Sequence, residues 1–260
     1  MNALIILGLL VVLMLTGMPI SISLGLTVLS FLFFLTEVPI ESVALKLFTG
    51  IEKFEIMAIP FFILAGNFLT HGGVAKRMIG FATSMVGHWH GGLGLGGVVA
   101  CALFAAVSGS SPATVVAIGS ILLPAMVKAG FPKSFGAGVI TTSGALGILI
   151  PPSIVMVMYS VSTNTSVGAL FMAGVIPGLL LAFFLGLTTW YRAKKNNYPC
   201  QPKATWAERW VAFRKAIWGL LLIVVVMGGI YSGMFTPTEA AAMSAVYAFV
   251  VAVFVYKDMG

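Results

Sequence analysis

A short polar segment, Ser108-Gly-Ser-Ser-Pro112, separates two apolar stretches in the first half of the chain. The stretches cover residues 91–107 and 113–127, and nearly all of their residues are apolar or glycine. Each is shorter than the ~20 residues that a membrane-spanning helix needs. The pattern therefore predicts a re-entrant helical hairpin over residues 91–127 with the serines at its tip. Backbone can leave the helix at membrane depth only where protein buries it or where it lines a cavity.

The composition requires a membrane. Hydrophobic residues make up 60% of the 260 residues, charged residues only 8%, and the mean hydropathy is +1.09. One soluble core of this size cannot bury so much apolar surface. Because no strand-like alternation is visible, we predict an all-α integral membrane protein, multi-pass in the lipid bilayer.

Most of the positive charge lies in one segment. Residues 192–215 contain seven Lys and Arg side chains and one Glu, while the whole chain has a net charge of +7. A basic run can bind nucleic acid, but beside a hydrophobic span the positive-inside rule accounts for it. We therefore predict a cytoplasmic loop over 192–215 and no nucleic-acid partner.

The rest of the chain is expected to form helices of a single domain, 1–260. The expected parts are a broken N-terminal span with an interfacial helix (1–56, the helix over 37–56), a first repeat (57–190) with the hairpin and a broken helix (134–162), the basic loop (191–215) and the start of a second half (216–260). At Gly17-Met-Pro19 the sequence allows either one kinked helix or two short helices. Thr236-Pro-Thr-Glu239 predicts a capping box that opens a helix.

The expected broken helix contains Pro151 and Pro152, which supply no N–H donors. Carbonyl groups about one turn earlier, near Gly147, therefore lose their helical partners. Carbonyl and hydroxyl oxygens are hard, uncharged ligands that suit Na⁺ better than a transition metal. If the hairpin tip meets this break, its serines complete a cation site. The alternative is that Gly and Ser only allow helices to pack closely.

The same break exposes a helix N-terminus, which favours an anion such as a carboxylate. The sequence has no nucleotide-binding loop of the form G-x-x-x-x-G-K-[ST], so an ion gradient is the simpler energy source. Every Asp, Glu, Lys, Arg and His can be placed at an interface or in a loop. We therefore do not expect an enzyme.

Five motifs, in this order along the chain, carry a resemblance to a known family. They are Gly17-Met-Pro-Ile20, Ala58-Ile-Pro-Phe-Phe-Ile-Leu-Ala-Gly66, Ser108-Gly-Ser-Ser-Pro-Ala-Thr114, Gly147-Ile-Leu-Ile-Pro-Pro-Ser153 and Phe235-Thr-Pro-Thr-Glu-Ala-Ala241. The chain resembles the large membrane subunit of tripartite ATP-independent periplasmic (TRAP) transporters, which are elevator-type carriers of the ion-transporter superfamily.

The resemblance implies a Na⁺-coupled importer of an organic acid, such as a C4-dicarboxylate or sialic acid, in the bacterial inner membrane. It implies two protein partners: a periplasmic substrate-binding protein and a small four-helix membrane subunit. Placed on the matching motifs, the implied Na⁺ ligands are Ser108 and Ser111 with carbonyls of Gly147, Ile150 and Pro152. Ser110 and Ser153 are implied to contact the carboxylate substrate.

The resemblance also implies a second, inverted half with its own hairpin, whereas this sequence stops soon after the Phe-Thr-Pro-Thr-Glu motif. We therefore expect the N-terminal part of such a permease, forming one half of the carrier. Two other interpretations stay open: a truncated or split permease with only a scaffold role, and an ion channel.

Overall fold

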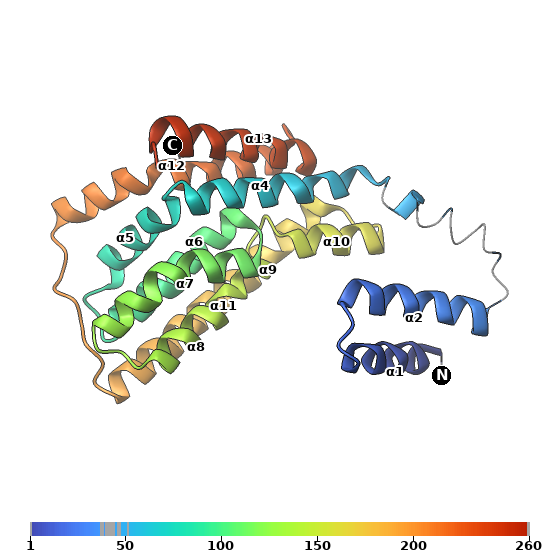
Figure 1. Cartoon of the computed structure of the whole chain (residues 1–260). Helices are drawn as coiled ribbons and strands as arrows, with labels where there is room; N and C mark the ends of the chain where they lie inside the picture. Colours follow the sequence, from blue (N-terminus) through green and yellow to red (C-terminus); the bar gives the residue numbers. More distant parts are fainter. Residues whose placement is uncertain (1, 37–38, 40–44, 46–47, 51, 259–260) are drawn as a thin grey trace. The chain divides into compact units, whose positions relative to one another are not determined.

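The computed structural model describes residues 2–36, 39, 45, 48–50 and 52–258, and the described residues are almost entirely helical (Figure 1). The elements are α1 (Asn2–Leu15), α2 (Ile20–Leu35), η1 (Phe54–Met57), α4 (Ala58–His71), α5 (Val74–Val86), α6 (Gly92–Ser108), α7 (Ser111–Lys128), α8 (Lys133–Gly144), α9 (Leu146–Leu149), α10 (Ile154–Thr163), α11 (Val167–Lys195), α12 (Trp206–Tyr231), α13 (Pro237–Val250) and η2 (Val251–Val255). The chain divides into two compact units, 1–53 and 54–260, where the sequence predicted one domain.

The first unit contains a helical hairpin. Helices α1 and α2 pack against each other, and the chain reverses between them at Gly17, which has a φ of +80°. Pro19 has φ −54° and ψ 140° and precedes the first residue of α2. The Gly-Met-Pro motif therefore separates two short helices, which answers the question that the sequence left open. Half of the expected interfacial helix over 37–56 lies outside the described residues.

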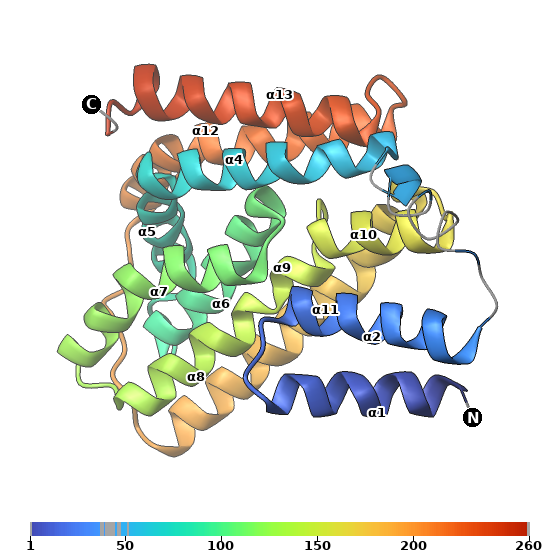
Figure 2. The same cartoon turned by 45° about the vertical axis from the view of Figure 1, so that its right-hand side comes forward.

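In the second unit, α4 packs along α13, and α12 lies beside α13 (Figures 1 and 2). Helix α5 contacts both α6 and α12, and α6 and α7 pack together as a helical hairpin, whose re-entrant course in the membrane stays a prediction. Helix α8 packs against both helices of that hairpin. The core of this unit includes Phe62 of α4, Phe104 of α6 and Phe171 of α11, each fully buried.

Helix α11 closes the unit on the side of the expected helix break. A Cβ atom added at Gly174 would lie 2.6 Å from the carbonyl oxygen of Leu149, and one added at Gly178 would lie 2.8 Å from Cγ1 of Ile150. Two glycines four residues apart share one helix face and let a neighbouring backbone approach closely. The segment between α9 and α10 therefore rests on a glycine seam of α11.

Within the described residues, five helices are long and apolar enough to cross a membrane, or six if the bent pair α8–α9 and α10 counts as one span. The prediction of an all-α integral membrane protein is confirmed. Helix α6 has 17 residues and α7 has 18, so the two arms of the hairpin lie at the lower limit of length. Cys101 is buried and Cys200 is exposed, and both are free thiols.

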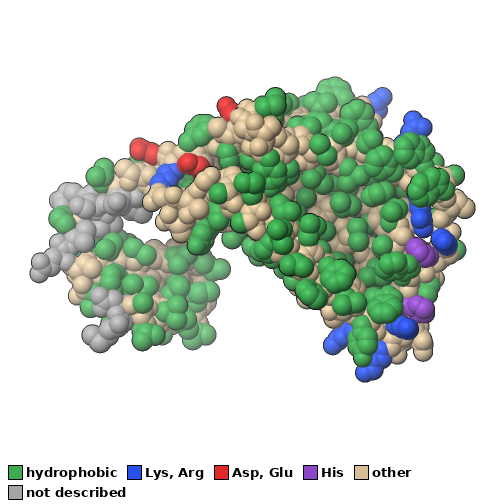
Figure 3. All heavy atoms as spheres, turned by 180° about the vertical axis from the view of Figure 1, so that it is seen from behind, with side chains coloured by type: hydrophobic (Ala, Val, Ile, Leu, Met, Phe, Trp, Pro, Cys, Tyr) green, Lys and Arg blue, Asp and Glu red, His purple; other side chains and the backbone are tan. Residues whose placement is uncertain are grey.

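The basic segment differs from the expected loop, because most of it is helical. Residues 192–195 form the last turn of α11 and residues 206–215 the first turns of α12, so only 196–205 lie outside helices. Basic side chains at the C-terminus of α11 are favoured by the helix dipole. In the view from behind, Lys and Arg side chains gather along one edge of the second unit (Figure 3).

The Phe-Thr-Pro-Thr-Glu motif forms the turn into α13. Thr236 Oγ1 accepts a hydrogen bond from the Glu239 N–H, and the Glu239 carboxylate accepts one from the Thr236 N–H at 2.8 Å. This is the predicted capping box. The Phe235 ring packs against Gly229, and the Thr238 hydroxyl donates to the Phe54 carbonyl at 3.2 Å. The motif thus fixes α13 to both α12 and η1.

The capping box predicts a measurable loss when its hydroxyl is removed. We expect Thr236→Ala to lower the free energy of unfolding by about 1 kcal/mol, because the Glu239 N–H loses its acceptor. Detergent or urea titration of helicity measures the change. Thr188→Ala is the control, because that hydroxyl only donates to the Phe184 carbonyl within its own helix. Equal stability of Thr236→Ala and the parent would contradict the role given to the box.

Candidate functional site at the hairpin tip

The tip of the hairpin is a two-residue turn between α6 and α7. Helix α6 ends at Ser108, Gly109 has a φ of +61°, and Ser110 has extended backbone before α7 begins at Ser111. Glycine enters the left-handed region without steric strain. Pro112, in the first turn of α7, fits there because that turn does not need its N–H.

The predicted break in residues 134–162 is also present. Helices α8 and α9 are followed by the non-helical residues Ile150 to Ser153, and the axis bends by 41° before α10. Ile150 has extended backbone, and the two prolines that follow it cannot donate to an earlier turn. Ser153 is the N-cap of α10, and its hydroxyl accepts a hydrogen bond from the Met156 N–H at 3.4 Å.

The tip and the break lie against each other. The Ile154 N–H donates to the Gly109 carbonyl at 3.0 Å, and a Cβ added at Gly109 would lie 2.8 Å from the Pro152 carbonyl oxygen. On the other side, a Cβ added at Gly147 would lie 2.8 Å from the Ser111 nitrogen. Only glycine fits at either position with this backbone, so two unwound segments far apart in sequence make one compact junction.

The hydroxyl groups at the tip differ in burial and in hydrogen bonding. Ser108 is buried, and its Oγ lies 3.0 Å from the Thr114 Oγ1, which in turn donates to the Ser110 carbonyl at 2.9 Å. Ser111 is half-buried, and within the described part of the chain its hydroxyl makes no hydrogen bond. The Ser111 oxygen therefore keeps its full capacity to bind a ligand.

Two carbonyl groups of the break are also unused. Among the described residues, no hydrogen bond ends on the carbonyl oxygens of Ile150 or Pro152. Buried carbonyls are normally paired, and leaving one without a partner costs free energy. Ile150 is half-buried and Pro152 is buried, so an electropositive ligand would compensate for these missing bonds.

Four helix ends converge at the junction. Helices α6 and α9 end there, and α7 and α10 begin there. Carbonyl groups at helix C-termini carry partial negative charge and N–H groups at N-termini partial positive charge. Cation ligands and anion-binding N–H groups are therefore available side by side. Discontinuous helices in membrane carriers bind both kinds of ligand in this way.

The structure brings the expected cation ligands into one neighbourhood. The tip residues that carry Ser108 and Ser111 contact the segment from Gly147 to Pro152. Of the two residues expected to contact substrate, Ser110 is half-buried at the N-cap of α7, whereas Ser153 is fully buried with its hydroxyl used as a cap. Their roles toward a substrate stay predictions.

Two further hydroxyl groups at the site were not singled out from the sequence. The Thr114 hydroxyl is hydrogen-bonded to the Ser108 hydroxyl. In the sequence, the only indication of this role is that Thr114 lies one helical turn after Ser110. Ser143 of α8 is fully buried, and its Oγ has no hydrogen-bond partner among the described residues. It lies in the last turn of α8, four residues before Gly147 of α9. Its only sequence signal was a polar residue just before the break.

Comparison with known proteins identifies the family of the chain. Residues 7–260 match the family model "Tripartite ATP-independent periplasmic transporter, DctM component". The chain is 76% identical over 273 aligned positions to the C4-dicarboxylate TRAP transporter large permease protein of Rhodobacter capsulatus, covering 100% of this chain and 62% of that protein.

The corresponding C4-dicarboxylate permease of Vibrio cholerae is 55% identical, with 95% of this chain and 55% of that protein aligned. A sialic acid TRAP permease of the same organism is 39% identical over 95% of this chain and 58% of that protein. The chain thus spans about 55 to 62% of the length of these curated relatives. These relatives are permeases rather than enzymes. The chain belongs to the DctM family, the large permease subunits of TRAP transporters.

Proposed function

We propose that this chain is the cation-binding half of a Na⁺-coupled importer of organic acids, in which Na⁺ binds where the hairpin tip meets the helix break. The proposal rests on the unpaired carbonyls of Ile150 and Pro152 in the break and on the unbonded Ser111 hydroxyl at the hairpin tip, which packs against that break. Ser108 and the carbonyl of Gly147 complete the proposed ligands. All of these are hard, neutral oxygens.

The substrate is proposed to be a carboxylate, and the N-termini of α7 and α10 are its expected binding groups. The relatives are named for C4-dicarboxylates and for sialic acid, which are both organic acids. Ser110 and Ser153 are the side chains nearest to these N-termini. The second half of the permease would supply the remaining pocket.

Coupling to Na⁺ would allow the carrier to accumulate its substrate inside the cell. One unit charge crossing 100 mV releases ~2.3 kcal/mol, and every ~1.4 kcal/mol changes an equilibrium ratio tenfold. Two net charges moving inward would therefore support roughly a thousandfold gradient. In the proposed elevator mechanism, bound Na⁺ orders the substrate site, and the part that carries the hairpin then moves past a scaffold of flanking helices.

The proposed partners are a periplasmic substrate-binding protein and a small four-helix membrane subunit, in the bacterial inner membrane. The clustering of Lys and Arg along one edge of the second unit supports a cytoplasmic position for that edge. The basic segment 192–215 lies within this edge. Substrate would then arrive from the opposite side, to which the N-terminus of α13 and Glu239 belong.

Na⁺ binding can be measured on this chain without transport. We expect the melting temperature of the purified chain to rise with NaCl but not with choline chloride. Ser111→Ala should shift the midpoint of that rise to at least tenfold higher Na⁺, about the effect of losing ~1.4 kcal/mol of binding. Ser120→Ala on the same helix is the control, since its hydroxyl only donates to the Ala117 carbonyl. An unchanged midpoint in Ser111→Ala would rule out this ligand.

A second comparison separates a cation site from simple close packing. Gly147→Ala places a methyl group 2.8 Å from the Ser111 nitrogen, so the junction must open. We expect it to abolish the Na⁺ effect and to lower stability by about 1–3 kcal/mol. Gly138→Ala on α8 meets nothing within 4 Å and should leave both properties intact. If Gly147→Ala lowered stability yet kept the full Na⁺ response, the junction would be a packing contact only.

Transport requires the complete permease. In proteoliposomes that contain the full-length permease, the small subunit and the binding protein, we expect uptake of a C4-dicarboxylate to stop when Na⁺ is replaced by choline. A rate independent of Na⁺ would refute the coupling. Electrical recording without the binding protein tests the channel alternative, for which ion currents would persist. A scaffold role predicts normal uptake in the Ser111→Ala variant.

A further inference from the structure

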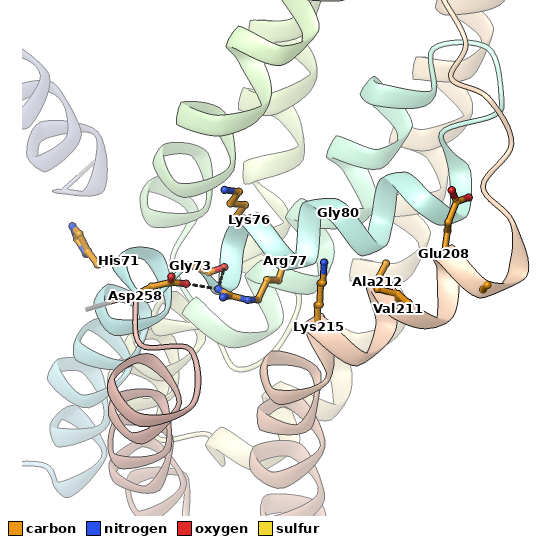
Figure 4. A pocket seen from close by; sticks show the side chains of 11 residues that line it. His71, Gly73, Lys76, Arg77, Gly80, Glu208, Val211, Ala212, Lys215 and Asp258 are labelled. Carbon is orange, nitrogen blue, oxygen red and sulfur yellow. Dashed lines mark hydrogen bonds and ion pairs between the residues drawn. The ribbon is translucent and has the colours of Figure 1, made fainter. Parts of the chain in front are cut away.

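A cavity lies at the basic end of the same unit, and none of the residues of the hairpin tip or the break lines it. It is formed by α5, the first turns of α12 and the segment after η2, with a volume of about 820 Å³ (Figure 4). The charged side chains that line it include Lys76 and Arg77 of α5, Lys215 of α12 and Asp258. Nothing in the proposed transport cycle uses this cavity.

One wall of this basic pocket is held in place by Arg77. Its Nη1 donates to the Gly73 carbonyl at 3.0 Å and forms an ion pair with Asp258. The guanidinium also lies 3.8 Å from the ring centre of Tyr256, whose hydroxyl donates to the Lys215 carbonyl at 2.6 Å. These contacts fix α5, α12 and the segment 256–258 to one another. The Nη2 and Nε donors of Arg77 make no hydrogen bond among the described residues, so they stay available.

The charges in the pocket do not balance. Asp258 compensates Arg77, and the Glu208 carboxylate accepts a hydrogen bond from the Thr205 N–H at the start of α12. For the ammonium groups of Lys76 and Lys215, no ion pair or hydrogen bond occurs within the described residues. Lys215 extends from α12 toward α5, the helix that carries Lys76 and Arg77 (Figure 4). The pocket therefore attracts an anion.

Apart from His71 and Glu208, the rest of the lining is apolar or glycine, which limits the kind of anion. Val211 and Ala212 of α12 and Gly80 of α5 form the wall beside the charged groups. On the neighbouring surface of α12, Trp206 is 81% exposed and Trp210 is 60% exposed. Tryptophan is enriched at the level of lipid headgroups. A ligand with a phosphate and an apolar part fits this lining better than inorganic phosphate or a small dicarboxylate.

We propose that the basic pocket binds the phosphate headgroup of an anionic phospholipid. Lys76, Lys215 and the free donors of Arg77 contact the phosphate, and the glycerol and first methylenes lie along Val211 and Ala212. Basic pockets between membrane helices on the side of excess positive charge bind such headgroups. The bound lipid joins α5 to α12 and stabilises the unit. This inference does not depend on Na⁺ coupling or on any substrate.

The test uses the whole chain, purified in neutral detergent and titrated with phosphatidylglycerol or phosphatidylcholine. Native mass spectrometry counts the retained lipids. We expect preferential binding of phosphatidylglycerol and a loss of roughly fivefold in affinity for each of Lys76→Gln and Lys215→Gln. The control is the double variant Lys128→Gln and Lys133→Gln, which removes twice the charge of either single variant, from the α7–α8 turn, and should bind as the parent does.

Two further measurements distinguish lost lipid binding from other effects. The charge-preserving variants Lys76→Arg and Lys215→Arg should retain binding, which separates lost binding from lost folding. Inorganic phosphate at millimolar concentration should not displace the lipid, because it lacks the apolar part. The proposal is overturned if the glutamine variants bind phosphatidylglycerol as tightly as the parent, if the control variant loses as much affinity, or if inorganic phosphate displaces the lipid completely.

Discussion

The rest of the structure depends on one requirement, which is that backbone polar groups inside a bilayer find partners within the protein. The tip at Gly109–Ser110 and the break at 150–153 are two of the described segments that leave the helix, and both interrupt apolar stretches of the sequence. Each lies against the other, and the Ile154 N–H meets the Gly109 carbonyl. Neither segment would be tolerable alone in lipid. The pairing of the two irregular segments therefore satisfies part of the backbone that each of them frees from helical hydrogen bonds.

The same pairing supports the proposal that the junction is a site and not only a packing contact. Prolines 151 and 152 remove donors, so the junction satisfies part of its backbone and leaves the Ile150 and Pro152 carbonyls unused. Glycines at 109 and 147 bring the two segments so close that no side chain separates them. Oxygen atoms are thereby concentrated in a small volume without any ionised side chain. Neutral oxygen ligands bind a monovalent cation weakly enough to release it again.

Much of this architecture could be predicted from the sequence, because it rests on residues with a narrow structural meaning. The Gly109 turn, the proline pair and the Thr236–Glu239 box each allow few backbone conformations, and all three lie where expected. Other features could not be predicted. Charge alone does not distinguish a basic loop from the helical ends around residues 192–215. Which hydroxyls are already used, as at Ser153, depends on local cap geometry that sequence does not encode directly.

The contact between α4 and the hairpin tip differs from the contact between the tip and the break in packing distance and in hydrogen bonding. A Cβ added at Gly66 would sit 3.5 Å from the Cβ of Ser108, an ordinary van der Waals separation, and no hydrogen bond between described residues joins α4 to the tip. Against the break, by contrast, the tip makes a hydrogen bond. It also approaches so closely that a Cβ atom added at Gly109 or Gly147 would lie 2.8 Å from an atom of the other segment. The serine turn is therefore tied more firmly to α9 and α10 than to α4, which it meets through van der Waals packing alone.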